Sequence, residues 1–181
     1  MAGLPRAMNV AYAPLSTSVG RLWMAASDAG VLRIALGSPG ERAFVHDLTR
    51  RAGSPAVLLK DTAALRELGR QLLEYFDGRR KSFDLPIDLS GVSPFQRRVL
   101  EAAREIRYGA VLTYGALASA IGMPGAARAV GGALGANPIP ILVPCHRIVA
   151  ADGGLGGFTV KGCPDGLGLK RRLLALEGAR L

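Results

Sequence analysis

One of the chain's two cysteines directly precedes one of its two histidines, in the segment Pro144-Cys145-His146-Arg147. A thiol is a good nucleophile only as thiolate, and a neighbouring imidazole and guanidinium are the groups that lower its pKa. In a β-strand, adjacent side chains point to opposite sides, so a water molecule is the expected carrier of a proton from Cys145 to His146. The segment predicts a reactive cysteine with a histidine base.

An imidazole that acts as a base needs an acceptor on its other nitrogen to hold its tautomer. The only acidic residues after His146 are Asp152, Asp165 and Glu177. Glu177 lies at the end of the last predicted helix, whose leucines form an apolar face that must pack on the domain. We expect Glu177 to orient His146, the alternative being an exposed carboxylate at a helix end.

The residues that precede the cysteine predict a frame for binding DNA. Ser93-Pro94-Phe95-Gln96 is a capping box that opens one helix, Thr113 caps a second, and a third is expected over 125–135. Two short helices joined by a tight turn are the outline of a helix-turn-helix. The third helix is almost bare of large side chains except Arg128, which suits a DNA groove; a helix buried against protein is the alternative.

The apolar run 141–143, which follows Asn137-Pro138-Ile139-Pro140, is expected to be a buried strand that leads to the cysteine.

The first 80 residues predict a small antiparallel sheet followed by helices. Apolar runs at 9–13, 21–26 and 31–36 are separated by Ser, Asp and Gly. Ser38 and Asp61 are the expected caps of two helices. Residues 79–92 are typical of a linker, so we predict an N-terminal domain over 1–80, a linker over 81–92 and a C-terminal domain over 93–181. His46 is expected on a helix surface and not as a ligand.

The composition is that of a globular protein with a basic surface. The 181 residues are 49% hydrophobic and 20% charged, with a net charge of +9. Residues 1–90 hold 12 basic and 9 acidic side chains, whereas residues 91–181 hold 11 and 5. The positive charge thus gathers in the half that carries the cysteine, as docking on phosphates requires; a basic surface kept for solubility is the alternative.

The sequence carries no sign of a membrane or secretory protein. No apolar run has the length of a membrane span, and residues 1–6 lack the features of a signal peptide. Two cysteines do not make a disulfide framework. We therefore expect a cytoplasmic protein.

Three segments together resemble one family. They are Pro144-Cys145-His146-Arg147, the helix segment 128–134 (Arg-Ala-Val-Gly-Gly-Ala-Leu) and the pair Asn137-Pro138. These segments closely resemble the O6-alkylguanine-DNA alkyltransferases, or methylated-DNA–protein-cysteine methyltransferases, with the strong match over about 93–178. The resemblance implies an α/β two-domain protein with a ribonuclease-H-like N-terminal domain and a mostly helical, winged helix-turn-helix-like C-terminal alkyltransferase domain.

The resemblance also implies roles for individual residues. Cys145 is the expected alkyl acceptor, His146 the water-mediated base, Glu177 its orienting carboxylate and Asn137 the hinge between the DNA-facing helix and the active-site segment. Arg128 resembles the finger that fills the gap left by an extruded nucleotide. The expected DNA contacts are Tyr114, Arg128, Ala129, Gly132 and Arg147. The expected walls of the base pocket are Tyr114, Pro140, Val143, Gly156, Phe158 and Thr159.

The implied reaction is a single-turnover transfer of the alkyl group from O6-alkylguanine in duplex DNA to Cys145, with O4-methylthymine as a further candidate substrate. Because the O6 atom is out of reach inside the duplex, the base must be flipped out. We expect a monomer without cofactor or metal. Cys163 is read as a bystander, and the loop 160–166 is longer than the family's usual passage to the final helix.

Two other functions remain open from the sequence. A helix-turn-helix protein that binds lesions without transfer would use Cys145 only as a core residue. A Cys-His hydrolase would need a base from elsewhere in the chain, and the other histidine, His46, lies in a different domain.

Overall fold

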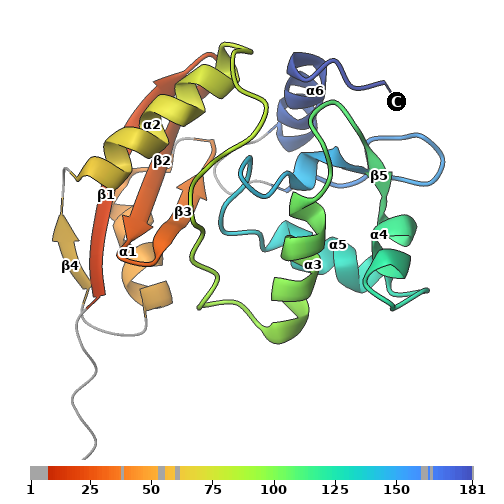
Figure 1. Ribbon diagram of the computed structural model, residues 1–181, viewed down its shortest axis with the longest axis horizontal. Helices are drawn as coiled ribbons and strands as arrows, with labels where there is room; N and C mark the ends of the chain where they lie inside the picture. Colours follow the sequence, from red (N-terminus) through yellow and green to blue (C-terminus); the bar gives the residue numbers. More distant parts are fainter. Residues whose placement is uncertain are drawn as a thin grey trace, which may run out of the picture.

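The computed structural model describes residues 8–37, 39–52, 56–59, 62–159, 163 and 165–180. The chain folds into two domains that lie side by side (Figure 1): a small sheet flanked by helices, and a mostly helical domain that ends in α6 (Gly166–Leu176). The two-domain α/β architecture expected from the sequence is therefore confirmed. The predicted caps Ser38 and Asp61, and most of the loop 160–166, lie outside the described residues.

The N-terminal sheet has the strand order β3-β2-β1-β4. Strands β1 (Met8–Thr17), β2 (Gly20–Ser27) and β3 (Gly30–Ala35) pair antiparallel, as the three apolar runs predict. The fourth strand, β4 (Ala56–Leu59), pairs parallel with β1. Four residues are too few to show a period in the sequence, so this edge strand was not predicted.

Two helices cover opposite faces of this sheet (Figure 1). Helix α1 (Glu41–Ala52) buries Phe44 and Leu48 against Trp23 and its neighbours on one face. Helix α2 (Ala63–Phe76) packs on the other, where the core of the sheet continues into the C-terminal domain. The N-cap of α2 is Thr62 and not Asp61, so the predicted cap is wrong by one residue. The Thr62 side chain accepts a hydrogen bond from the backbone N–H of Leu65.

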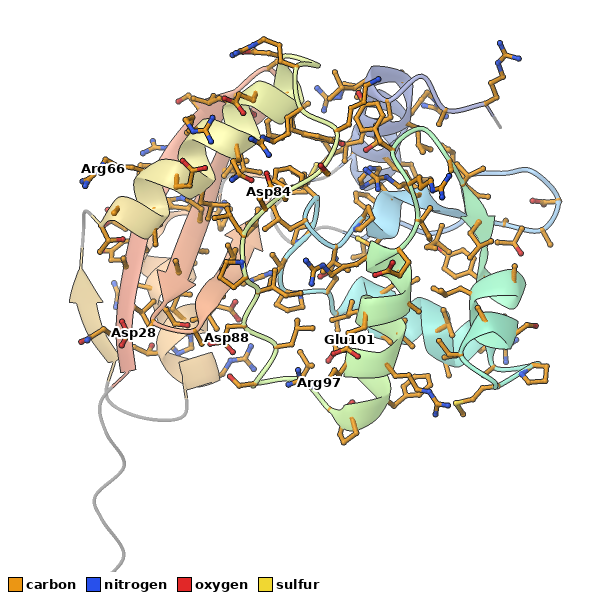
Figure 2. All side chains as sticks on the ribbon, viewed as in Figure 1. Asp28, Arg66, Asp84, Asp88, Arg97 and Glu101 are labelled. Atoms are coloured by element: carbon orange, nitrogen blue, oxygen red, sulfur yellow. The ribbon has the colours of Figure 1, made fainter. Side chains whose placement is uncertain are left out.

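The segment between the domains is fastened to the edge of the sheet. The backbone of Val31 in β3 accepts a hydrogen bond from Asp88 N–H and donates one to Pro86 O, both at 2.8 Å. The carboxylate of Asp88, which is labelled in Figure 2, accepts a hydrogen bond from Ser27 Oγ at 2.8 Å. This segment therefore forms a β-bridge between Ile87 and Val31, which ties the chain before α3 to the edge of the sheet.

The C-terminal domain is built from α3 (Pro94–Arg104), α4 (Tyr114–Ala120), α5 (Ala127–Gly135) and α6, with a two-residue pairing of β5 (Leu112–Thr113) and β6 (Ile148–Val149). Ser93 and Thr113 cap α3 and α4 as predicted. The capping box at Ser93 is only half formed, because the Gln96 side chain donates to the carbonyls of Ala133 and Ala136 instead. Gln96 thus ties α3 to the end of α5.

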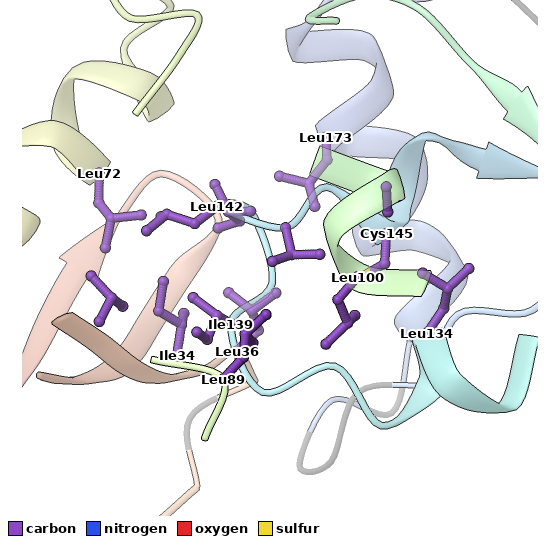
Figure 3. Packing of buried hydrophobic residues seen from close by; sticks show 14 of the residues in the cluster. Ile34, Leu36, Leu72, Leu89, Leu100, Leu134, Ile139, Leu142, Cys145 and Leu173 are labelled. Atoms are coloured by element: carbon purple, nitrogen blue, oxygen red, sulfur yellow. The ribbon is translucent and has the colours of Figure 1, made fainter. Parts of the chain in front are cut away.

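The apolar core runs without interruption from one domain into the other. It extends from Ile34 in β3 and Leu72 in α2, past Ile139, to Leu100 in α3 and to Cys145 (Figure 3). A shared core of this kind fixes the position of one domain relative to the other. The cysteine lies at its far end, where the core meets the surface.

Candidate active site

Cys145 opens one turn of 3-10 helix, η1 (Cys145–Arg147), and not the end of a strand. The predicted strand over 141–143 is wrong: these residues form a turn in which Ile141 has a φ of 79°. The turn is closed by a hydrogen bond from Val143 N–H to Ile139 O at 2.9 Å. Apolar side chains on a buried turn resemble a buried strand in sequence, which explains the error.

Asn137 holds this turn together through its side chain. Its Nδ2 donates to Val143 O at 2.9 Å and to Cys145 Sγ at 3.2 Å, and its Oδ1 accepts from Ile139 N–H at 2.9 Å. Asn137 therefore lies where the hinge was predicted, and it also contacts the sulfur. One buried amide joins the end of α5 to the nucleophile.

His146 and Glu177 are both buried, and they are paired. The His146 Nε2 lies 2.8 Å from Glu177 Oε1. Because an ionised carboxylate can only accept, Nε2 carries the hydrogen. His146 Nδ1 has no hydrogen-bond partner among the described protein groups, so its lone pair is left to take up a proton. Burial lowers the pKa of His146, against the opposing effect of Glu177, so the ring is neutral at neutral pH.

The Glu177 carboxylate is enclosed by donors. Oε1 accepts from Tyr75 Oη at 2.7 Å and Arg147 Nη2 at 2.9 Å, and Oε2 accepts from Arg147 Nε at 2.8 Å and Gly109 N–H at 3.2 Å. Burial alone would raise the pKa of Glu177, but the hydrogen bonds from His146, Arg147 and Tyr75 outweigh it and hold the pKa well below its usual range. The carboxylate stays charged and orients the imidazole.

Arg147 does not lie where the sequence predicts. It was expected to contact DNA, but the residue is only 5% exposed, and its guanidinium forms a two-point ion pair with Glu177. Because Nε and Nη2 of this guanidinium donate to the Glu177 carboxylate, they cannot donate to a DNA phosphate. The prediction for Arg147 is wrong, and the residue belongs to the network behind His146.

The Cys145 thiol is protonated at rest. Burial raises its pKa, although the hydrogen bond from Asn137 and the charge of Lys170 oppose this effect. A pKa lowered by Arg147 was expected, but that guanidinium is engaged with Glu177. The thiol must therefore lose its proton when it reacts, which is the task that the free Nδ1 of His146 can perform.

Lys170 is a buried cation near the cysteine that the sequence analysis missed. It lies in α6 with no exposed surface, and its Nζ donates to the carbonyls of Ile148 and Leu155. The same Nζ lies 5.9 Å from the centroid of the Tyr114 ring and 5.8 Å from that of Phe158. Burial lowers the pKa of Lys170 to about 8. A lysine in an amphipathic helix is usually exposed, so the sequence held no signal for it.

A cleft of about 1240 Å³ opens beside Cys145. Of the predicted pocket residues, Tyr114, Pro140, Phe158 and Thr159 line it, together with Cys145 and Asn137. Val143 is fully buried behind the turn. The Tyr114 hydroxyl donates to Gly157 O at 3.0 Å and so joins α4 to the pocket loop.

Gly156 stands behind the Tyr114 ring and not in the wall of the cleft. Its φ is +65°, and a Cβ at this position would lie 2.9 Å from Tyr114 Cε2. Only glycine fits both the backbone conformation and the close approach. Gly156 shapes the pocket indirectly, by giving room to Tyr114.

Helix α5 presents an exposed, smooth face next to the cleft. Arg128, Ala129 and Gly132 are all exposed, whereas Val130, Ala133 and Leu134 are buried against the domain. Three of the five predicted DNA-contact residues are thus exposed on α5, and one of them, Arg128, lines the cleft that contains Cys145.

Tyr75 is the second residue of the site that sequence analysis missed. Tyr75 lies on the buried face of α2, but its hydroxyl reaches Glu177 in the other domain. A tyrosine at a core position usually finds a partner for its hydroxyl, and that was the only signal available.

His46 is exposed on α1, and Cys145 and Cys163 are free thiols. Within the described part of the chain, no group of three or more His, Cys, Asp or Glu side chains is placed to hold a metal ion. Among the same residues, no helix combines the length and apolar character needed to cross a membrane.

Two family models match the chain. Residues 94–179 match the DNA binding domain of 6-O-methylguanine DNA methyltransferase, and residues 10–89 match the ribonuclease-like domain of the same family. Together the two matches cover most of the chain.

Individual relatives agree with the family models. A methylated-DNA–protein-cysteine methyltransferase of Mycolicibacterium paratuberculosis is 52% identical over 107 residues, which are 59% of this chain and 61% of the relative. One of Methanosarcina acetivorans is 48% identical over 114 residues, 63% of this chain and 69% of the relative. The crystal structure of Mycobacterium tuberculosis OGT in complex with DNA superposes with a TM-score of 0.76 at 35% identity, covering 93% of this chain and 92% of that one.

Proposed function

Because the chain belongs to the 6-O-methylguanine DNA methyltransferase family, we propose that it repairs duplex DNA by transferring the alkyl group of O6-alkylguanine irreversibly to its own Cys145. The observation that carries this proposal is that Cys145 shares one cleft with Arg128 of the smooth helix, while the His146–Glu177 pair lies behind it. A groove-facing helix, a nucleophile and a base are thus assembled in one domain.

The proposed chemistry is a displacement at the alkyl carbon. The thiol proton passes through water to His146 Nδ1, and the thiolate attacks the carbon attached to O6. A sulfur–carbon bond forms while the carbon–oxygen bond breaks, and its electron pair stays on the guanine. The guanine takes up one proton, for which Tyr114 is the proposed donor, so the overall reaction neither gains nor loses protons. The thioether cannot return to thiol, and each molecule repairs one lesion.

Flipping of the damaged nucleotide is the second part of the proposal. We assign Arg128 as the finger that fills the gap in the stack, with Ala129 and Gly132 allowing α5 to approach the groove closely. Tyr114, Pro140, Phe158 and Thr159 would hold the flipped base. Positive charge concentrated in residues 91–181 supports docking on phosphates.

Finer features of the architecture and location are proposed on the same basis. We propose that residues 1–80 form a ribonuclease-H-like domain, 81–92 the linker, and 93–181 a winged helix-turn-helix-like domain. The free thiols of Cys145 and Cys163 support a cytoplasmic location. We also propose that the protein is a monomer and that O4-methylthymine is a second substrate.

A mass measurement tests the function. The protein is incubated with duplex DNA that carries one O6-methylguanine, and intact and peptide masses are recorded. We expect one methyl group on the peptide that contains Cys145, saturating at one per molecule, and no adduct with Cys145→Ala, which should still bind the duplex.

Tight binding without an adduct would instead support the lesion-binding alternative. Binding that does not weaken with salt would contradict docking on phosphates.

A further inference from the structure

The N-terminal domain places one polar group in the active-site network. Tyr75, in the last turn of α2, has no exposed surface, and its hydroxyl donates to Glu177 Oε1 at 2.7 Å. The Tyr75 hydroxyl oxygen also lies 3.5 Å from His146 Nε2. The hydroxyl therefore stands beside the hydrogen bond that sets the tautomer of His146.

The other donors to Glu177 all come from the C-terminal domain. They are His146 and Arg147 of η1, and Gly109 of the loop that follows α3. Among the described residues, Tyr75 is the one donor that crosses from the other domain. Its ring is held by edge contacts with Phe76 and Tyr108, at centroid distances of 5.4 and 6.2 Å, so the hydroxyl has little freedom to move.

We propose that Tyr75 is a positioning residue: through its hydroxyl, the N-terminal domain fixes the Glu177 carboxylate that orients and polarises His146. This inference gives the N-terminal domain a part in the chemistry beyond packing, and its consequence for alkyl transfer rests on the proposed function. Tyr75 touches neither the nucleophile nor the substrate cleft, so it acts only through Glu177 and His146.

The physical consequence of removing the hydroxyl has a definite sign. A donor to Glu177 spreads the negative charge of the carboxylate, so loss of Tyr75 Oη concentrates that charge toward His146. The protonated imidazole is then favoured, and the titration of His146 moves to higher pH. The charged or ionisable groups that act directly on the His146–Glu177 pair are Arg147, Lys170 and Tyr75. The Tyr108 ring lies 5.9 Å from the Arg147 guanidinium, and its hydroxyl donates to a backbone carbonyl and not to the pair.

Tyr75→Phe isolates this effect because it keeps the ring and removes only the hydroxyl. Tyr108→Phe is the matched control: it removes a hydroxyl from the same aromatic cluster, but one that donates to Leu176 O at 2.9 Å and not to the carboxylate. The chain has only two histidines, so an NMR titration resolves His146, with the exposed His46 as internal reference.

We expect Tyr75→Phe to raise the titration midpoint of His146 and leave that of His46 unchanged. Because the Glu177 carboxylate and the His146 ring are then held less firmly, methyl transfer at pH 7 should slow about fivefold despite the more basic ring, the rate equivalent of one ordinary hydrogen bond. DNA affinity should not change, and Tyr108→Phe should leave the His146 titration as in the unaltered protein. An unchanged His146 titration in Tyr75→Phe overturns the inference, whether or not the unaltered protein transfers alkyl groups. Absence of transfer by the unaltered protein overturns the proposed function alone.

Discussion

Arg147 and Glu177 form a buried two-point ion pair, with Nε to Oε2 at 2.8 Å and Nη2 to Oε1 at 2.9 Å. The side chains are 7% and 0% exposed. The arginine of the Cys-His-Arg motif therefore supports the histidine through a carboxylate that lies 30 residues later in the sequence. The proposed function thus gives the three consecutive residues of η1 different tasks: nucleophile, base and support of the base.

Replacement of Arg147 by alanine should destabilise the protein strongly. It leaves Glu177 charged and buried without its main partner, and breaking such a pair costs about 3–5 kcal/mol. Urea unfolding of the unaltered protein and the variant measures the difference. The matched control is Arg79→Ala, whose exposed side chain pairs with the exposed Asp77 at 2.7 Å; that change should cost less than about 1 kcal/mol. Similar losses in both variants would mean that the Arg147 pair is not a structural element.

The sequence predicts those parts of the site that rest on local patterns. The caps Ser93 and Thr113 and the smooth helix with Arg128 depend on short spacings. The assignment of Glu177 to His146 depends on a choice among three carboxylates, of which only Glu177 follows an apolar helix face. Arg147, Tyr75 and Lys170 could not be placed in the same way, because burial and long-range partners decide their roles. The turn at Ile141 was missed because an apolar run indicates burial but does not distinguish a strand from a buried turn.

Lys170→Met should slow alkyl transfer at pH 7. The buried ammonium lowers the pKa of Cys145, so its loss makes the thiolate harder to form. A higher pKa of Cys145 lowers the population of thiolate at pH 7, so we expect the variant to react more slowly than the unaltered protein. Single-turnover rates on methylated duplex DNA measure the effect. An unchanged rate would show that Lys170 has only a structural role, as a hydrogen-bond donor to the carbonyls of Ile148 and Leu155.

The same lysine predicts a pH dependence of stability. The folded protein lowers the pKa of Lys170 to about 8, below the value of an unfolded lysine. Between pH 8 and about 10.4 the unfolded chain then binds more protons than the folded one, so this group makes stability rise with pH in that window. Unfolding free energies at pH 7.5 and 9.5 should therefore increase more in the unaltered protein than in Lys170→Met. An equal change in both proteins would mean that the ammonium is not desolvated.

Gly156→Ala should impair the pocket by displacing Tyr114. The new Cβ would lie 2.9 Å from the Tyr114 ring, and the residue would keep a φ of +65°. We expect a loss of stability of about 1–3 kcal/mol from the strained backbone, and in addition a slower reaction with a free O6-alkylguanine base. Gly153→Ala is the control, since Gly153 has a φ of +82° with nothing within 4 Å of its Cβ position. It should lose stability but keep its rate; equal rates in the two variants would contradict a role for the Tyr114 position.

Arg128→Ala should separate base flipping from chemistry. Arg128 is exposed on α5 and lines the cleft, but it does not support Cys145 or His146. Extruding a paired base costs a few kcal/mol, so loss of the finger should slow repair of duplex DNA by about tenfold or more, while reaction with a free alkylguanine base stays nearly unchanged. Arg172→Ala removes the same charge from an exposed position on α6 and controls for general electrostatics. Single-turnover rates on both substrates measure the split. Equal losses on duplex and free base would show that Arg128 acts in the pocket and not in the DNA stack.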